Sequence, residues 1–244
     1  MLQLFKLKSV PSWFIWLQRR GKSPGKVALV TGGDSGIGRA VCHCFAMEGA
    51  TVAFTFVKGH EDRDAQDTLQ MLRRAKGNDA KDPITIAADL GFDDNCKRAV
   101  DEVARFEAHE GRRLHHQHNI DKCIQGNAKL LDYTSTKGAI VAFTRGLALQ
   151  LVGKGIRVNG VVPGPIWTPL IPASFSEEET AKFRSEVPMQ RAGQPIEVAP
   201  SYVFLASNMD SSYITGQVLH PNGMSSLRMA LWSLLIKEAL LSGY

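Results

Sequence analysis

The stretch KVALVTGGDSGIGRA, residues 26–40, decides the fold of this chain. Residues 26–30 form a short apolar run rich in β-branched side chains, which predicts a buried strand. A tight turn of glycines and small polar residues follows, and Gly36 and Gly38 then open a predicted helix. A helix N-terminus after such a turn presents free backbone N–H groups and partial positive charge, both of which favour phosphate. We therefore predict a strand–turn–helix unit that holds a phosphate group.

The glycines of this turn indicate which phosphate ligand it takes. They have no Cβ, so a pyrophosphate and the strand can both come close to the backbone. No Gly-Lys-Ser/Thr follows the turn, which argues against a nucleoside triphosphate loop. An ordinary βα turn without a ligand is the alternative, but the flanking strand and helix favour a dinucleotide. The residues predicted to surround the phosphates are Gly32, Ser35, Gly36, Ile37 and Gly38.

Length and composition are those of an ordinary globular protein. A chain of 244 residues with 44% hydrophobic and 22% charged residues suits one α/β domain with a sizeable core. The formal net charge of +5 is concentrated near the N-terminus, because the first acidic residue is Asp34. We find no basic helix interleaved with aromatic residues and no zinc-finger spacing, so we predict no nucleic-acid partner. The four cysteines form no CxxC pair and indicate reduced intracellular thiols.

Residues 1–25 are predicted to be a basic extension outside the folded domain. They contain no acidic residue, and their apolar patch at 13–17 is too short to cross a bilayer. No small-residue cleavage site follows the patch, which argues against a secretory signal. We predict a cytoplasmic location. Targeting to an organelle is the alternative, because an acid-poor basic extension has the right bias although its serine content is low.

Strand and helix patterns alternate along the rest of the chain. This spacing predicts the α/β class, with a Rossmann-type doubly wound parallel sheet that binds ligands at the carboxyl ends of its strands. A predicted helix at 174–187 is acid-rich and suits a lid over the substrate. The remaining predicted strands are 51–57, 84–88, 156–161 and 217–220, and the other helices are 61–76, 93–106 and 195–207.

The end of the second predicted strand distinguishes NAD from NADP. An acidic residue about twenty positions past the glycines would bind the ribose hydroxyls of NAD. This chain has Lys58 there and no acid before Glu61, so we favour NADP, with a solvated lysine as the alternative for Lys58. Asp89, followed by Leu90, ends the third strand and is predicted either to read the adenine amino group or to cap the next turn.

A second chemical motif lies at Tyr133 and Lys137, which open a long predicted helix running to about residue 153. Residues i and i+4 share a helix face, so the ammonium should lie near the phenol. A free phenol has a pKa of about 10, and a nearby cation lowers it by favouring the phenolate. Tyr133 can then exchange a proton with a substrate hydroxyl or carbonyl while hydride moves to or from a nicotinamide.

Four motifs in this order resemble the short-chain dehydrogenase/reductase family, and within it the plant glucose and ribitol dehydrogenase homologues. They are TGGDSGIG at 31–38, Asp89, YTSTK at 133–137 and RVNGVVPGPIWTP at 157–169, and the resemblance covers residues 26–107 and 126–223. It implies that the glycines line the cofactor phosphates, that Tyr133 is the acid/base, and that Lys137 also binds the nicotinamide ribose. It also implies that Pro163, Gly164, Ile166 and Thr168 hold the nicotinamide end.

The chain departs from the family in its middle. Only 43 residues separate Asp89 from Tyr133, where the family has a helix and then two strands with a helix between them. A βαβ unit alone needs roughly thirty residues. The family's Asn-Asn-Ala-Gly strand is absent, Ile120 occupies the place of the catalytic Ser, and no Ser or Thr lies between Thr85 and Tyr133. We therefore predict that the sheet lacks two central strands and has an irregular junction at 108–125.

This junction is rich in histidine, which raises the question of a metal. Histidine and cysteine suit zinc, but the spacing matches no standard zinc site, so we predict no metal. The residues concerned are His109, His115, His116, His118 and Cys123.

The predicted helix after Tyr133 is apolar on nearly all sides, which indicates burial on both faces. One face would pack on the sheet, and the other predicts a homo-oligomer; the resemblance agrees, because the family dimerises through this helix. Residues 224–244 are predicted to form an added C-terminal helix, whose charges argue against a membrane span.

These observations predict an NAD(P)-dependent oxidoreductase. Its substrate would be a sugar, a polyol or a small carbonyl or alcohol, with Tyr133 as the acid/base. The alternative is a non-catalytic truncated variant that keeps the cofactor turn and the dimer helix.

Overall fold

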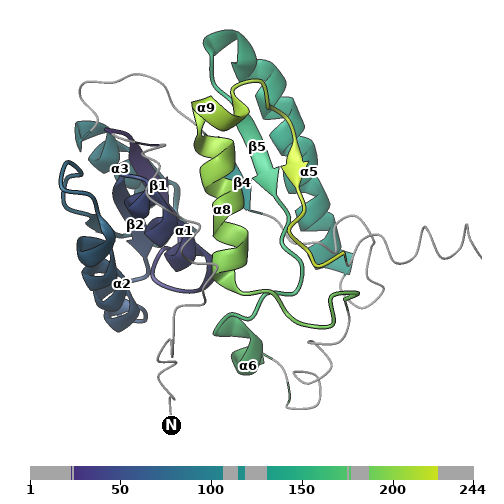
Figure 1. The fold of residues 1–244 in the computed structure, drawn as a ribbon, viewed down its shortest axis with the longest axis horizontal. Helices are drawn as coiled ribbons and strands as arrows, with labels where there is room; N and C mark the ends of the chain where they lie inside the picture. The colour runs from purple at the N-terminus through teal and green to yellow at the C-terminus, as the bar shows by residue number, and fades with distance from the viewer. Residues whose placement is uncertain are drawn as a thin grey trace, which may run out of the picture.

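The computed structural model describes residues 23, 25–106, 115–118, 131–174, 176 and 187–224 of the chain. Helices and strands alternate through these residues, which confirms the predicted α/β class (Figure 1). The first half contains β1 (Val27–Val30), α1 (Gly36–Met47), β2 (Thr51–Phe56), α2 (Asp62–Ala75), β3 (Ile84–Ala87) and α3 (Asp93–Phe106). The second half contains β4 (His115–His118), α5 (Leu131–Leu151), η2 (Val152–Lys154), β5 (Val158–Val161), α6 (Leu170–Ser174), α8 (Pro195–Ala206), α9 (Asn208–Ser211) and β6 (Val218–Leu219).

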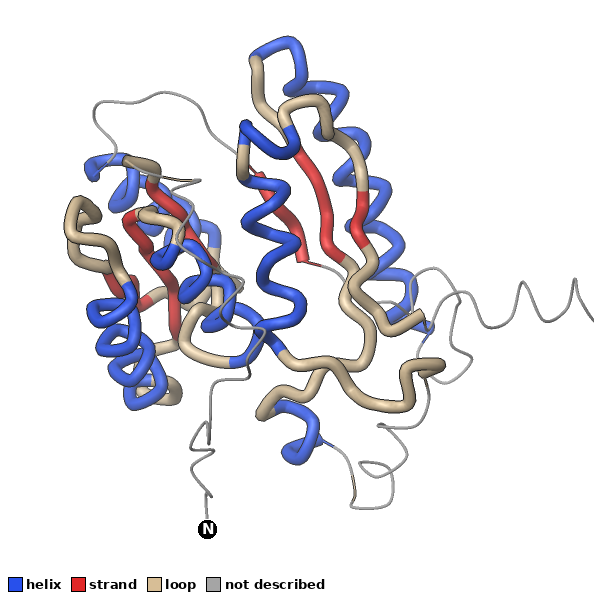
Figure 2. The backbone as a smooth tube through the Cα atoms, in the orientation of Figure 1, coloured by secondary structure: helices blue, strands red, loops and turns tan. Residues whose placement is uncertain are grey.

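The described strands form two parallel three-stranded sheets, one with the order β1-β2-β3 and the other with the order β4-β5-β6. Figure 2 shows these two groups of strands side by side. Placed end to end, they give the order 3-2-1-4-5-6 of a doubly wound nucleotide-binding sheet. Within the described residues, however, β1 pairs only with β2 and β4 pairs only with β5. The sheet is therefore divided at its centre.

Helices cover both faces of the first sheet, and α1 and α8 pack together to join the two halves. The main core combines apolar side chains of α1, β2, α2 and α8 with Val161 of β5. Strand β2 alternates as a strand must, with Val52 and Phe54 in this core and Ala53 in a second cluster beside α3. This two-sided burial is the doubly wound arrangement expected from the sequence.

Arg157 ties the start of β5 to the C-terminal helices. Its buried guanidinium donates hydrogen bonds to the carbonyl oxygens of Leu205 and Ile214, at 2.8 and 3.3 Å, and to the hydroxyl of Ser211 at 3.2 Å. Burial lowers the pKa of Arg157 from its ordinary value. The Leu205 carbonyl oxygen at the end of α8 helps to compensate for the lost hydration, since the C-terminal end of a helix favours a cation.

The junction at 108–125 differs from the sequence expectation at four residues. His115–His118 form β4, which pairs in parallel with β5 from His115 opposite Val158 to His118 opposite Val161. The junction predicted to be irregular thus contains a short strand, because the open edge of β5 can pair the backbone of any extended segment, whatever its side chains. One strand thus stands where the resemblance implied two. The rest of the junction lies outside the described residues.

The other predicted elements in the described residues are confirmed, with small shifts at their ends. The strand predicted at 156–161 begins at Val158, and the helix predicted from Tyr133 begins at Leu131. Most of the predicted lid helix at 174–187, the basic extension and the C-terminal helix lie outside the described residues. Within the part that is described, no helix combines the length and the apolar character needed to cross a membrane.

Candidate functional site

The glycine turn is held against the end of β2. The backbone N–H of Gly32 donates to the hydroxyl of Thr55, and that of Gly33 donates to the Thr55 carbonyl, both at 3.2 Å. Gly32 and Gly36 have φ values of +61° and +52°, a region that favours glycine. A Cβ on Gly38 would lie only 2.0 Å from the carbonyl oxygen of Gly32. The predicted strand–turn–helix unit is therefore confirmed, and its glycines are required by backbone geometry.

The N-terminus of α1 has the features of an anion site. Ser35 is the N-cap residue, and its side chain makes no capping hydrogen bond. The first turn contains Gly36, Ile37 and Gly38, and no acidic side chain lies in it. Because the first N–H groups of a helix have no intrahelical partner, they can donate hydrogen bonds to the oxygens of a phosphate.

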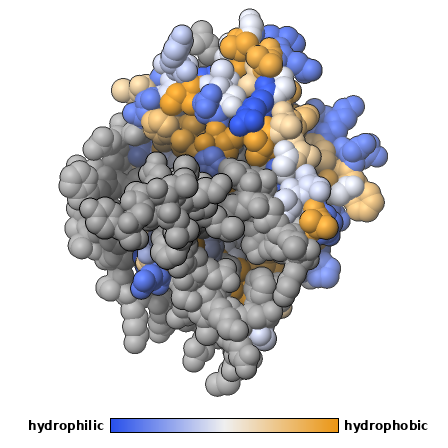
Figure 3. Space-filling view, turned by 90° about the vertical axis from the view of Figure 1, so that its right-hand side faces the viewer, coloured by the Kyte–Doolittle hydropathy of each residue, from blue (hydrophilic) through white to orange (hydrophobic). Residues whose placement is uncertain are grey.

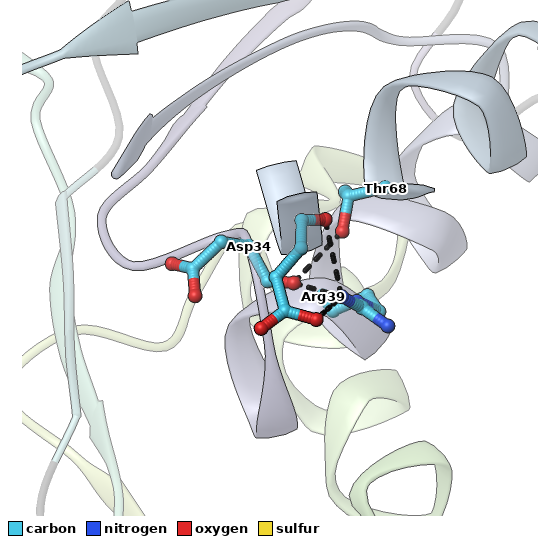
Figure 4. Close-up of polar contacts among 4 residues, drawn as sticks. Asp34, Arg39 and Thr68 are labelled. Atoms are coloured by element: carbon cyan, nitrogen blue, oxygen red, sulfur yellow. Dashed lines mark hydrogen bonds and ion pairs between the residues drawn. The ribbon is translucent and has the colours of Figure 1, made fainter. Parts of the chain in front are cut away.

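The carbonyl of Asp34 in the turn accepts two side-chain hydrogen bonds (Figure 4). Arg39 Nε of α1 donates to it at 2.6 Å, and the hydroxyl of the buried Thr68 of α2 donates to it at 2.9 Å. Arg39 Nη2 also donates to the carbonyl and to Oδ1 of Asp64, both at 3.1 Å. These contacts link the turn, α1 and α2 in one network.

A carboxylate lies at the end of β2, although no acid follows that strand directly in the sequence. The chain reverses after Val57, so that Glu61 Oε2 accepts the Val57 N–H at 2.6 Å. Lys58, predicted to meet a 2′-phosphate, is exposed next to this point. The sequence identified Glu61 as the first acid after this strand, but it did not predict that the Glu61 carboxylate lies at the end of β2. Its separation of about twenty residues from the glycines was the available signal.

The loop after β5 reaches the glycine turn from the other half of the molecule. A Cβ on Gly36 would lie 3.5 Å from Cγ2 of Thr168, so these two segments adjoin. Pro163 and Gly164 are buried at the start of the loop, and a Cβ on Gly164 would lie 2.6 Å from the backbone of Asn222. The structure therefore brings one predicted nicotinamide residue, Thr168, to the turn that was predicted to hold phosphate.

The same loop is supported by the segment before α8. Ile166 forms a parallel bridge with Gly193, whose N–H donates to the Pro165 carbonyl at 2.9 Å. Arg191 and Glu197 form a two-pronged ion pair at 2.6 and 2.8 Å beside this bridge. The hydrogen bond from Arg191 lowers the pKa of the Glu197 carboxyl. The loop is thus anchored to the N-terminus of α8.

Tyr133 and Lys137 lie in the first turns of α5, four residues apart and so on the same helical face. The helix predicted to carry them is confirmed. The side chain of Tyr133 and the whole of Ile120, at the family's Ser position, lie outside the described part. The proton exchange assigned to Tyr133 stays a prediction.

Asp89 caps the turn that follows β3. Its Oδ1 accepts the Gly91 N–H at 2.9 Å, and its carbonyl accepts Asn95 Nδ2 at 2.9 Å. One of the two predicted roles, the turn cap, is therefore confirmed. The role at the adenine, for Asp89 and the exposed Leu90, stays a prediction.

The described residues contain no group of three or more histidine, cysteine, aspartate or glutamate side chains that could hold a metal. His109 and Cys123 lie outside them. Cys42 and Cys44 are buried free thiols in the core beside the turn. Burial raises the pKa of Cys44 to about 12 and also raises that of Cys42, which makes both poor nucleophiles at neutral pH.

Fold and site together define an α/β protein of the dinucleotide-binding class. The family described as "short chain dehydrogenase" matches residues 26–108, and that described as "Enoyl-(Acyl carrier protein) reductase" matches residues 119–223. The "Glucose and ribitol dehydrogenase" of Daucus carota is 58% identical over 83% of this chain and 85% of that protein. The "NADPH-dependent aldehyde reductase 1, chloroplastic" of Arabidopsis thaliana is 58% identical over 84% and 88%. The chain belongs to the short-chain dehydrogenase/reductase family of NAD(P)-dependent oxidoreductases.

Solved structures show the same fold. A blue fluorescent protein from a metagenomic library, in complex with NADPH, has a TM-score of 0.73 at 24% identity and covers 83% of this chain and 98% of its own. The promiscuous reductase LugOII has a TM-score of 0.72 at 21% identity and covers 84% and 100%. The divided sheet is therefore still recognisable as the fold of these proteins.

Proposed function

We propose that this chain binds NADP, or alternatively NAD, and transfers hydride to or from a sugar, a polyol, or a small carbonyl compound or alcohol. The observation that carries the proposal is the contact between the glycine turn and the Thr168 loop, which brings the predicted phosphate and nicotinamide residues together. The names of the carrot and Arabidopsis relatives support the substrate class and NADP. The proposal is tested by measuring cofactor-dependent turnover of a panel of aldehydes and sugars, in the directions of oxidation and of reduction.

The residues around the glycine turn fit the pyrophosphate of the cofactor. The absence of a Cβ at Gly38 lets α1 approach the Gly32 carbonyl closely, and that at Gly36 lets the turn approach Thr168. The N-terminus of α1 supplies N–H donors and positive potential for the pyrophosphate. When bound, the nicotinamide supplies or accepts the hydride. Tyr133 donates its phenolic proton to the carbonyl oxygen of the substrate, or receives it in the oxidation. Lys137, one helical turn further on, favours the phenolate that remains.

A gap in the middle of the chain is part of this proposal. The alignment with the carrot protein spans 249 positions, more than the whole 244-residue chain, so it must open gaps in this chain. Residues 109–118 fall between the two family matches. These facts support a missing segment before α5, and with it the alternative of a chain that binds cofactor but turns over substrate poorly.

A cytoplasmic location also stays a proposal. The alternative, targeting to an organelle through the basic residues 1–25, has the support of a chloroplastic relative.

We expect NADPH to bind at least as tightly as NADH, because Lys58 is exposed beside the end of β2. Lys58→Ala should weaken NADPH binding about threefold to fivefold and leave NADH within twofold, since an exposed charge pair contributes about 0.2–1 kcal/mol. Fluorescence titration with both cofactors measures this. A clear preference for NADH that Lys58→Ala does not change would contradict it.

We also expect a homo-oligomer that forms through α5. Thr144 and Ala148 are the buried residues in this part of α5, whereas the large apolar side chains of Phe143 and Leu149, on either flank of that buried face, are 58% and 80% exposed. Figure 3 looks onto the side where α5 lies and shows apolar side chains on the part that is not covered by grey atoms. We infer that these exposed apolar side chains belong to an interaction surface.

Light scattering tests the assembly. Leu149→Glu should dissociate it, because it places a charge in an apolar contact, whereas Met209→Glu on α9, at a position 85% exposed, should not. A monomeric unsubstituted chain with an intact circular dichroism spectrum would rule out this assembly.

A further inference from the structure

Charged side chains of both signs gather where β2 ends and α2 begins. Arg39 reaches this point from the first turns of α1 and pairs with Asp64 of α2. Glu61 returns to the end of β2 through its hydrogen bond with the Val57 N–H, and Lys58 follows Val57 directly. In doubly wound folds the adenosine ribose binds at the end of this strand, where an acid accepts its hydroxyls or an arginine accommodates a 2′-phosphate.

The geometry of Arg39 leaves part of its guanidinium for a ligand. Nε donates to the Asp34 carbonyl, and Nη2 donates to Asp64. Within the part of the chain that the structure describes, Nη1 makes no hydrogen bond, and the side chain is 32% exposed. Arg39 is therefore fixed in direction at two nitrogens while two N–H donors remain for a phosphate oxygen.

Asp64 has two opposite effects on such a ligand. Its carbonyl and Oδ1 hold Arg39 in place, at 3.1 Å each. Its carboxylate, however, is 57% exposed and carries the same sign of charge as a 2′-phosphate. A like charge close to the phosphate weakens binding, whereas a ribose hydroxyl in the same place is neutral and is not repelled.

We propose that Asp64 is a specificity-determining residue that limits the preference of this site for NADP over NAD. Arg39 contacts the 2′-phosphate, and the carboxylate of Asp64 reduces the gain from that contact. Glu61 supplies the acceptor for the free ribose hydroxyls of NAD. The inference rests on the proposed function, because it requires the glycine turn to bind the dinucleotide.

The test uses the full chain and two adenosine fragments, adenosine 2′,5′-bisphosphate and 5′-AMP, in calorimetric titrations. Asp64→Asn keeps an oxygen that can accept from Arg39 but removes the charge. We expect it to bind the bisphosphate about fivefold more tightly and 5′-AMP within twofold of the unsubstituted chain, the range of exposed charge interactions. Arg39→Gln should weaken the bisphosphate about fivefold and leave 5′-AMP within twofold.

Asp79→Asn is the matched control. It makes the same charge change beyond the C-terminal end of α2, a 14-residue helix, and so about 20 Å from the first turn. It should leave both affinities within twofold of those of the unsubstituted chain.

Unchanged or weaker bisphosphate binding in Asp64→Asn overturns the inference, as does an equal gain in Asp79→Asn. The inference is also overturned if the Arg39→Gln chain binds the bisphosphate as tightly as the unsubstituted chain. This second test remains available even if the Asp64→Asn chain fails to fold. If the unsubstituted chain binds neither fragment, the proposed function fails and the inference fails with it. Binding of both fragments with no effect of the variants sinks the inference alone.

Discussion

We expect that restoring the family's middle segment before α5, with its serine, will raise turnover at least a hundredfold over the chain as it stands. The sequence predicts Ile120 in the place of that serine, and no hydroxyl-bearing residue lies between Thr85 and Tyr133. Loss of one oriented donor to a developing oxyanion costs roughly a hundred- to a thousandfold in rate. The restored and unrestored chains are purified side by side and assayed with NADPH and a panel of aldehydes and sugars.

The sheet gives a second reason to expect this gain. Among the described residues, β1 pairs on one side only, and Leu29 in this strand is 37% exposed. Each buried polar group left without a partner costs about 1–3 kcal/mol, against a total stability of roughly 5–15 kcal/mol. A strand beside β1 would therefore also raise the free energy of unfolding.

Tyr133→Phe in the restored chain is the control for chemistry. It removes the phenolic proton and should abolish the gained turnover while the restored stability remains. Comparable turnover of the restored and unrestored chains would show that the missing strands and serine are dispensable, and the interpretation of the gap would then be wrong.

Gly38→Ala should weaken cofactor binding. Its Cβ would lie 2.0 Å from the carbonyl oxygen and 2.8 Å from the carbonyl carbon of Gly32, and both are backbone atoms of the turn. The turn must move to relieve this contact, so the N–H groups that we propose bind the pyrophosphate move with it. Overpacking of this kind costs about 1–3 kcal/mol, or roughly 2–12 °C in Tm for a chain of this size. We expect at least a tenfold loss of 5′-AMP affinity, which is 1.4 kcal/mol or more.

Gly138→Ala is the matched control for this substitution. Gly138 lies within α5, and a Cβ there would meet nothing within 4 Å. Alanine in a helix interior is more favourable than glycine by about 1 kcal/mol, so Tm should stay or rise and 5′-AMP binding should not change. Calorimetric titration and thermal unfolding measure both variants. Wild-type affinity in Gly38→Ala would show that the close approach of turn and helix is not required.

The sequence by itself determined the elements that depend on local patterns. The turn before α1 could be predicted because its glycines, its apolar strand and its helix all lie within fifteen residues. The boundaries of α3, Asp93–Phe106, coincide with the predicted 93–106 because one amphipathic stripe defines this helix. The order of four motifs along the chain was enough to indicate the family.

The tertiary structure decided what depends on segments distant in the sequence. A polar His-His-Gln-His segment becomes β4 because β5 offers it an edge, which no local pattern could indicate. Glu61 reaches the end of β2 only because the chain reverses after Val57, and Arg39 meets Asp64 only because α1 and α2 pack together. Backbone pairing and helix packing bring these groups within hydrogen-bond distance, and side-chain periodicity carries no information about such contacts.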